Sequence, residues 1–124
     1  MKKPKTLRFS AGRNIAMKVP SHEYSRTVEF YRDVISLPLI DRGPGSVIFQ
    51  FGDKKLWIDR EDQINKAELW LEIVTNDVES AEKYCKNNDL QYRNRIEELP
   101  EGFKGFWIVN PAGIVHLVSS DRVQ

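Results

Sequence analysis

The sequence predicts a single α+β domain of two consecutive βαβββ modules, which form a curved mixed sheet with outer helices and a concave face. Two observations lead to this expectation. An alternating strand pattern followed by an amphipathic helix pattern occurs twice, and three short strands follow each occurrence. We place the modules at residues 13–60 and 68–119 of one domain spanning 13–119. Residues 1–12 are expected as a disordered or extended lead-in and 120–124 as a tail.

The first module begins with a strand and a helix. Residues 13–19 alternate between apolar and polar or small side chains, which is typical of a half-buried strand. Ser21 is expected to cap the helix that follows, in which apolar residues recur at helical spacing, and Pro38 stops it. This helix should lie across the apolar side of the strand.

Three short strands complete the first module, over residues 39–42, 46–51 and 55–60, with glycine-containing turns between them. In the last of these strands Trp57 and Asp59 lie on the side opposite the apolar residues of the same strand. They are expected to face away from the helix.

The second module repeats this order of elements. Residues 68–74 alternate as residues 13–19 do. Asn76 and Glu79 then resemble a capping box, which predicts the start of a helix. A strand over residues 90–96 follows that helix. Each module alone has a small core, so the two modules are expected to bury their helices against one side of a common sheet.

The last element of the second module is a hairpin over residues 106–118. Its two apolar runs are joined by the turn Asn110-Pro111-Ala112-Gly113, which supplies the backbone conformations of a tight turn. Alternation places Val115 and Leu117 on one side and His116 on the other. On an otherwise apolar face, His116 is either a hydrogen-bonded residue of the core or pocket wall, or a ligand or base.

The core expected from these patterns contains residues of both modules on the helix side of the strands and on the helices themselves. These are Ile15, Met17, Val19, Val28, Tyr31, Leu71, Ile73, Ala81, Val115 and Leu117.

Composition excludes several classes of protein. With 40% hydrophobic residues in 124, the chain can bury one proper core. Its 19 basic and 18 acidic residues are scattered, which excludes an electrostatic footprint for nucleic acid or an anionic membrane. No apolar run approaches the length of a membrane span. The single cysteine, Cys85, fits the reducing cytoplasm and a buried place in the second helix.

The order of elements resembles that of the vicinal oxygen chelate superfamily, which includes glyoxalase I, the fosfomycin- and bleomycin-resistance proteins and the extradiol dioxygenases. The resemblance covers residues 13–119 and includes the pair Phe30-Tyr31 before a strand and the turn at 110–113 before the last strand. Such turns more often read Asp-Pro-x-Gly, so Asn110 departs from the pattern. The resemblance implies a glyoxalase-like fold and a homodimer.

Enzymes of this superfamily hold a divalent metal on the concave face, with a histidine near the start of each module's first strand and a carboxylate on each last strand. Of the positions that match, the first strand has Asn14 and the last strand of the first module has Trp57, with Asp59 beyond it. The last strand of the second module has His116 in place of a glutamate. Amide and indole groups cannot replace imidazole and carboxylate ligands.

The fourth matching position depends on the register of residues 68–74, and Glu68, Leu69 or Trp70 could occupy it. Matching the apolar triplets of the two first strands favours Glu68 and turns Trp70 and Glu72 toward the concave face. Only Glu68 and His116 then remain as metal ligands, which are too few for a selective site. We expect no stoichiometric metal and no cofactor.

Two functions stay open. The first is metal-independent binding of a small aromatic or apolar molecule, as in the bleomycin-resistance branch, by Asn14, Trp57, Asp59, Trp70 and His116. The second is a lyase, isomerase or dioxygenase that uses a metal, or that uses His116 as base with Glu72 or Glu68 as orienting carboxylate. The aromatic residues, including Trp107 at the edge of the face, could instead fill a core or a dimer interface.

Overall fold

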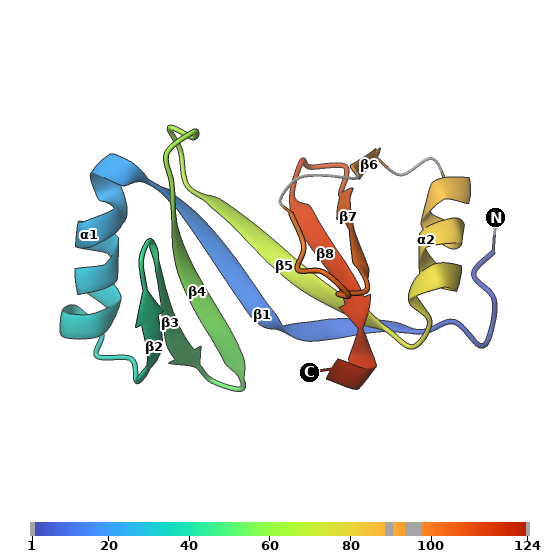
Figure 1. The fold of residues 1–124 in the computed structure, drawn as a ribbon, viewed down its shortest axis with the longest axis horizontal. Coiled ribbons are helices and arrows are strands. Elements are labelled where there is room, and N and C mark those ends of the chain that lie inside the picture. Colours follow the sequence, from blue (N-terminus) through green and yellow to red (C-terminus); the bar gives the residue numbers. More distant parts are fainter. Residues whose placement is uncertain (1, 89–90, 94–97, 124) are drawn as a thin grey trace. The chain divides into compact units, whose positions relative to one another are not determined.

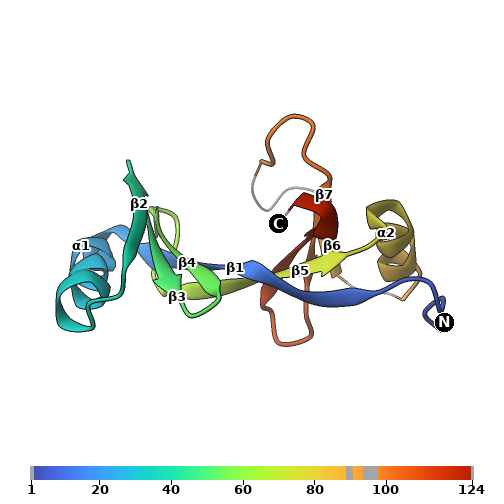
Figure 2. The same ribbon diagram turned by 90° about the horizontal axis from the view of Figure 1, so that it is seen from below.

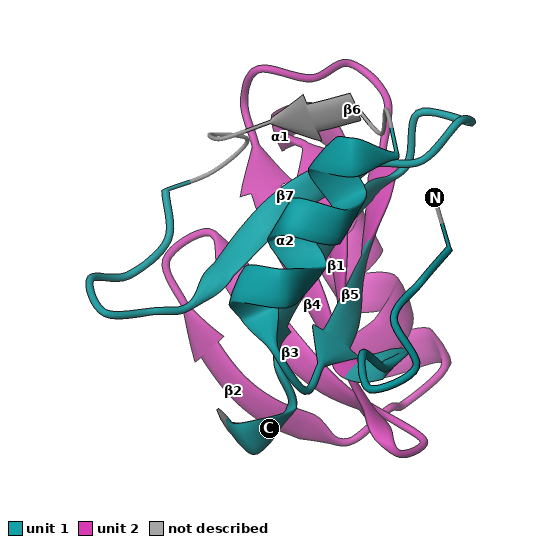
Figure 3. Ribbon diagram, turned by 90° about the vertical axis from the view of Figure 1, so that its right-hand side faces the viewer, with its two compact units in different colours: residues 1–12, 71–124 teal, residues 13–70 magenta. Residues whose placement is uncertain are grey.

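The computed structural model describes residues 2–88, 91–93 and 98–123 (Figure 1). The chain forms two compact units, coloured separately in Figure 3. Unit 2 contains residues 13–70, and unit 1 contains residues 1–12 and 71–124. Each unit is described by itself below.

Unit 2 has the βαβββ order predicted for the first module. Its strands lie in the order β2-β3-β4-β1, with β3 antiparallel to β2 and β4, and β4 parallel to β1. Helix α1 continues into one π-helical turn and lies beside these strands (Figure 2). The elements are β1 (Phe9–Pro20), α1 (Ser21–Glu29), the π-turn (Phe30–Val34), β2 (Leu39–Gly43), β3 (Ser46–Phe51) and β4 (Lys54–Glu61).

The core of unit 2 lies between α1 and the alternate side chains of its strands. Phe49 and Ile58 are fully buried there, and Tyr31 packs against the cluster from the π-turn. Its buried members are Val19, Val28, Val47, Phe49, Leu56 and Ile58. Because β-strand side chains alternate, the intervening residues of β1, β3 and β4 face away from α1.

Unit 1 has the same order of elements, which confirms the predicted second module and the α+β class. Its strands lie in the order β5-β8-β7-β6, with β8 parallel to β5 and antiparallel to β7. The elements are β5 (Glu68–Thr75), whose residues 68–70 belong to unit 2, α2 (Val78–Asn87), β6 (Gln91–Arg93), β7 (Gly105–Val109), β8 (Val115–Ser120) and a 3-10 turn (Asp121–Val123). Of the strand expected at 90–96, residues 90 and 94–96 lie outside the described residues.

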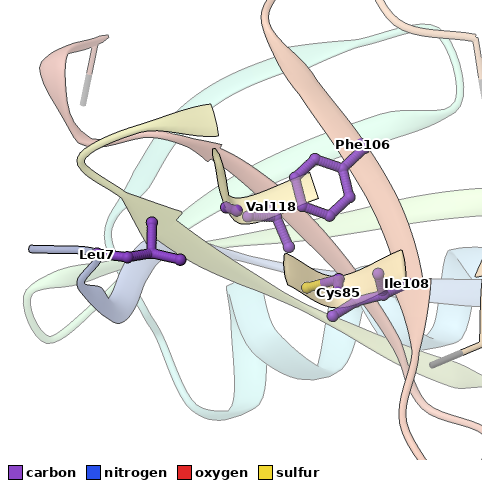
Figure 4. Close-up of a cluster of buried hydrophobic side chains, with 6 residues drawn as sticks. Leu7, Cys85, Phe106, Ile108 and Val118 are labelled. Atoms are coloured by element: carbon purple, nitrogen blue, oxygen red, sulfur yellow. The ribbon is translucent and has the colours of Figure 1, made fainter. Parts of the chain in front are cut away.

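The core of unit 1, which we call the α2 cluster, lies between α2 and the strands β7 and β8. Figure 4 shows Cys85 close to Ile108 in this cluster, and Cys85 is buried as predicted. The buried members are Leu7, Ala81, Cys85, Phe106, Ile108 and Val118.

The segment predicted as a disordered or extended lead-in belongs to unit 1. Leu7 is 2% exposed within the core, and β1 begins at Phe9. Asn76 holds the segment in place, because its side-chain amide donates to the carbonyl of Thr6 and accepts from the backbone N–H of Arg8, both at 2.8 Å. Burial of the apolar Leu7 side chain stabilises the packing of this otherwise polar stretch against the core of unit 1.

Both predicted helix caps are wrong. Helix α2 is capped by Asp77, whose carboxylate accepts from the backbone N–H and the hydroxyl of Ser80, and Asn76 binds the lead-in instead. At α1, Ser21 is the first helical residue, and its hydroxyl donates to Asp62 instead of accepting from a backbone N–H of the helix. Asn76 and Asp77 are both good capping residues, so the sequence does not distinguish them.

The predicted sides of β8 are reversed. Val118 is fully buried in the α2 cluster, whereas Leu117 is half-buried on the other face. Leu71 is 38% exposed rather than buried. Of the remaining predicted core residues, Val19, Val28, Ala81 and Val115 are buried, and Ile15, Met17, Tyr31 and Ile73 are half-buried.

Within the described part of the chain, no helix has both the length and the apolar content to cross a membrane.

Candidate functional site

Five side chains of unit 2 gather on the sheet face opposite α1, which we call the distal face. It is defined by Asn14, Lys18, Trp57, Asp59 and Trp70. The register pairs Lys18 with Asp59 between β1 and β4, and the Lys18 ammonium contacts the Trp70 ring. The structure thus brings together the predicted residues Asn14, Trp57, Asp59 and Trp70.

The indole of Trp57 is held by the amide of Asn14. Trp57 Nε1 donates to Asn14 Oδ1 at 2.8 Å, across the neighbouring strands β4 and β1. Both residues are half-buried. The bond satisfies the polar group of the indole, so the ring itself supplies apolar surface to the distal face.

A buried ion pair lies next to Trp57. Lys18 Nζ donates to Asp59 Oδ2 at 2.9 Å, and the exposed fractions of the two side chains are 6% and 19%. The other carboxylate oxygen of Asp59 accepts from the hydroxyl of Ser46 at 2.6 Å. Both oxygens of Asp59 therefore accept hydrogen bonds from protein groups, and Asp59 holds the Lys18 ammonium in place on the distal face.

Lys18 also contacts Trp70 through a cation–π interaction. The ammonium lies 4.3 Å from the centroid of the indole ring, while Trp70 Nε1 donates to Glu68 Oε1 at 3.1 Å. The sequence alone does not single out Lys18 or Ser46. The available signal was that Lys18 shares the strand face of Asn14, but its partner Asp59 is 41 residues away along the chain.

Glu72 and His116, both in unit 1, lie on opposite faces of the sheet. The register pairs Glu72 with Leu117 and Leu71 with His116. His116 is also paired with Ile108, a member of the α2 cluster, so its side chain is on the helix side. The predicted placement of His116 beside Glu72 is wrong, because β8 carries apolar residues on both faces and alternation alone does not tell them apart.

His116 and Glu72 each have a partner within unit 1. His116 Nδ1 lies 3.0 Å from the carbonyl oxygen of Leu71, which can only accept, so Nδ1 carries the proton in this contact. The carboxylate of Glu72 accepts from the Ser119 hydroxyl at 3.2 Å. Trp107 is buried at 4% exposure in β7, opposite Leu117 in the register. It belongs to unit 1 and not to the distal face.

The donor set does not fit the divalent metal that the family resemblance implies. Trp57 offers no lone pair, and the Asn14 oxygen already accepts the Trp57 N–H. Glu68 accepts from Trp70 in unit 2, and His116 is on the α2 side of unit 1. Among the described residues, no three His, Cys, Asp or Glu side chains lie close enough together to hold a metal ion.

Comparison with protein families and with curated proteins finds no match to this sequence. Solved structures do match. A Mn(II)-bound glyoxalase from Novosphingobium aromaticivorans has a TM-score of 0.66 and 17% identity, over 93% of this chain and 40% of that chain. A homoprotocatechuate 2,3-dioxygenase from Brevibacterium fuscum has a TM-score of 0.65 and 17% identity, over 96% of this chain and 35% of that one.

A third similar structure is matched over nearly its whole length. It is described as an NAD-dependent benzaldehyde dehydrogenase from Legionella pneumophila, with a TM-score of 0.61 and 14% identity, over 86% of this chain and 96% of that chain. The fold is therefore the glyoxalase-like fold expected from the resemblance to the vicinal oxygen chelate superfamily. Because proteins with different named activities share it, the fold by itself does not determine a reaction.

Proposed function

We propose that this chain binds a small aromatic or apolar molecule on the distal face of unit 2, without a metal. One observation carries the proposal. Trp57 and Trp70 lie on the same sheet face, and the N–H group of each is already bonded to a neighbouring side chain, Asn14 and Glu68. Fixed apolar surfaces with a few polar groups beside them are characteristic of small-molecule sites.

The energetics of the distal face favour a flat ligand. Both indoles are half-buried, so part of their surface is exposed to solvent. A ligand that covers this surface gains about 25 cal/mol per Å² of apolar area removed from water, less the cost of ordering the ligand. Since the indoles are held by hydrogen bonds, little additional side-chain ordering is required on binding.

The alternative of a lyase, isomerase or dioxygenase receives less support. Its acid–base version needs His116 and Glu72 together, and these residues lie on opposite faces of unit 1. Its metal version needs a ligand set that Asn14 and Trp57 do not supply.

A homodimer in the reducing cytoplasm completes the proposal. Exposed apolar side chains in unit 2 are consistent with association; they are Phe30, Val34, Ile35, Leu39 and Ile40. The only cysteine is free and buried, as suits a reducing compartment. Sedimentation at micromolar concentration should give the mass of a dimer, and a monomer there would remove the dimer from the proposal.

Binding can be tested with a library of small aromatic compounds, read by thermal shift and tryptophan fluorescence. A ligand that binds only the folded state raises the melting temperature, and contact with the indoles changes their emission. Trp57→Ala should weaken such a ligand by about tenfold or more, given the area of an indole.

Two control variants separate binding from folding. Cys85→Ser in the α2 cluster and Trp107→Phe in β7 change unit 1 and should leave affinity unchanged even where stability falls. If Trp57→Ala retains the fold and the affinity, or if the controls weaken the ligand as much, the distal face is not the binding site.

A further inference from the structure

We infer that the ligand of the distal face carries an electron-rich aromatic ring, and that Lys18 is the positioning residue that sets this preference through Trp70. The inference rests on the proposed function and names the class of ligand for the same site. It goes beyond the family resemblance, because it depends on a lysine, an aspartate and a tryptophan placed together in this chain.

The first step concerns which side of the indole a ligand can meet. Lys18 is 5% exposed, and its ammonium lies 4.3 Å from the centroid of the Trp70 ring. Trp70 itself is half-buried. Since a buried lysine occupies one side of the ring, the exposed surface of Trp70 lies elsewhere on the side chain. A ligand therefore meets Trp70 without touching Lys18.

The second step concerns why the lysine stays there. Asp59 accepts from Lys18 at 2.9 Å through one oxygen and from Ser46 at 2.6 Å through the other. The carboxylate is thus held on β4 by β3 and holds the ammonium on β1 in turn. A charge-assisted pair with a side chain only 6% exposed keeps the cation at a defined place under the ring.

The third step is electrostatic. An indole face carries negative potential, which repels the face of another electron-rich ring and is the reason why a cation binds there. A cation on one side draws the π-electron density toward itself and makes the opposite side less negative. Stacking with an electron-rich ring then costs less repulsion, and an electron-poor ring loses part of its attraction.

The test uses three neutral probes of similar size: 4-methoxybenzyl, 4-methylbenzyl and 4-nitrobenzyl alcohol. Their affinities for the whole protein are measured by calorimetry. The methoxy compound should bind about three- to tenfold more tightly than the nitro compound, the range expected from a cation–π contact. Because all three are uncharged, the order of affinities reports the electron density of the ring and not an ion pair.

The variants test whether Lys18 causes the order. The double variant Lys18→Met with Asp59→Asn removes the cation without leaving an unpaired carboxylate. The affinity ratio should then fall to one or below, because an indole without the cation repels an electron-rich ring, while all three probes still bind. Lys18→Arg keeps a cation and should keep the ratio. Lys83→Met removes an exposed lysine from α2 in unit 1 and should also keep it. A merely structural role of Lys18 would lower all three affinities together.

The outcomes separate this inference from the proposed function. Equal affinities in the native protein, tighter binding of the nitro compound, or a ratio that survives in the double variant would each overturn the inference and leave the binding site in place. If none of the three alcohols binds, the proposed function falls with it. If the double variant does not fold, the order in the native protein and its retention in Lys18→Arg still decide.

Discussion

The ammonium of Lys18 lies 2.9 Å from the carboxylate of Asp59, and the register places the two residues directly opposite each other in the parallel strands β1 and β4. The pair sits among the half-buried side chains of the distal face, and Lys18 is almost fully buried. Burying an ion pair in such surroundings carries a desolvation cost. Removing one partner costs more free energy, because the other charge stays buried without compensation.

Lys18→Met should therefore lower the free energy of unfolding by about 3–5 kcal/mol, because Asp59 would remain as a buried charge without its partner. Adding Asp59→Asn should restore much of the loss, since the neutral amide can still accept from Ser46. Urea unfolding of both variants measures the difference. Arg32→Met serves as the control, because its pair with Asp33 is 38% and 57% exposed and its removal should have little effect. Equal losses in the single and double variants would contradict the assignment.

The turn between β7 and β8 is stabilised by the side chain of Asn110. Asn110 Oδ1 accepts from the backbone N–H groups of Ala112 and Ile114, both at 2.9 Å, and Gly113 has a φ of 85°. Asn110→Ala should cost about 1–3 kcal/mol, the range for two lost hydrogen bonds. Asn110→Asp keeps an acceptor oxygen and is the matched control. Equal stability of Asn110→Ala and the native protein in urea would count against this role.

The distal face could be predicted from the sequence where one side of a strand is clearly apolar. In β4, Leu56 and Ile58 must be buried, so Trp57 and Asp59 are assigned to the other side without ambiguity. In β8, Val115 and Val118 are both buried although they lie on opposite faces, and the same reasoning fails. Alternation therefore assigns His116 to the wrong face of the sheet.

The contacts of Lys18 could not be predicted, because they depend on which strands are neighbours. The chain separates Lys18 from Asp59 by 41 residues, and only the parallel pairing of β1 with β4 brings them together. Alternation gives the face of a side chain but not its partner on the next strand. The same limit applies to Ser46, which reaches Asp59 from β3.

Purified, untagged protein should contain no stoichiometric zinc, iron, nickel or manganese. The expectation follows from the chemistry of the donors, since His116 has its Nδ1 at the Leu71 carbonyl, the Asn14 oxygen already accepts from Trp57, and the Trp57 indole has no lone pair to offer. Elemental analysis measures it directly. About one metal ion per chain, lost in His116→Ala, would contradict this expectation and favour the hypothesis of a metal-dependent enzyme.

The reactivity of Cys85 should depend on pH in one direction. Burial, and to a lesser extent the nearby charge of Glu82, raises the pKa of the Cys85 thiol, so the thiolate forms only above the usual range. The folded state then holds a proton that the unfolded state loses first. Stability from this group is complete below the unfolded thiol's pKa and is lost as pH rises through the folded one.

Iodoacetamide provides the measurement for Cys85. Alkylation of the native protein at pH 8 should be far slower than in urea, and it should speed up as pH increases. Cys85→Ser should lessen the decline of stability between about pH 8 and 10, the region where a free thiol titrates. Equal alkylation rates in the native and unfolded protein would show that the thiol is accessible and would contradict its burial.

Gly12 is required by the side chain of Glu72, which lies against it within unit 1. A Cβ at position 12 would lie 2.7 Å from Cδ of Glu72 and closer still to Oε1. Gly12→Ala should therefore cost about 1–3 kcal/mol, because Glu72 must swing away and lose the hydroxyl of Ser119. In a Glu72→Ala background the same substitution should cost less, with a coupling of about 0.5–3 kcal/mol between the two sites.

Gly43→Ala is the control, since a Cβ there meets no atom within 4 Å, and it should be neutral or stabilise slightly. Additive losses in the double variant would mean that Glu72 does not occupy the space beside Gly12.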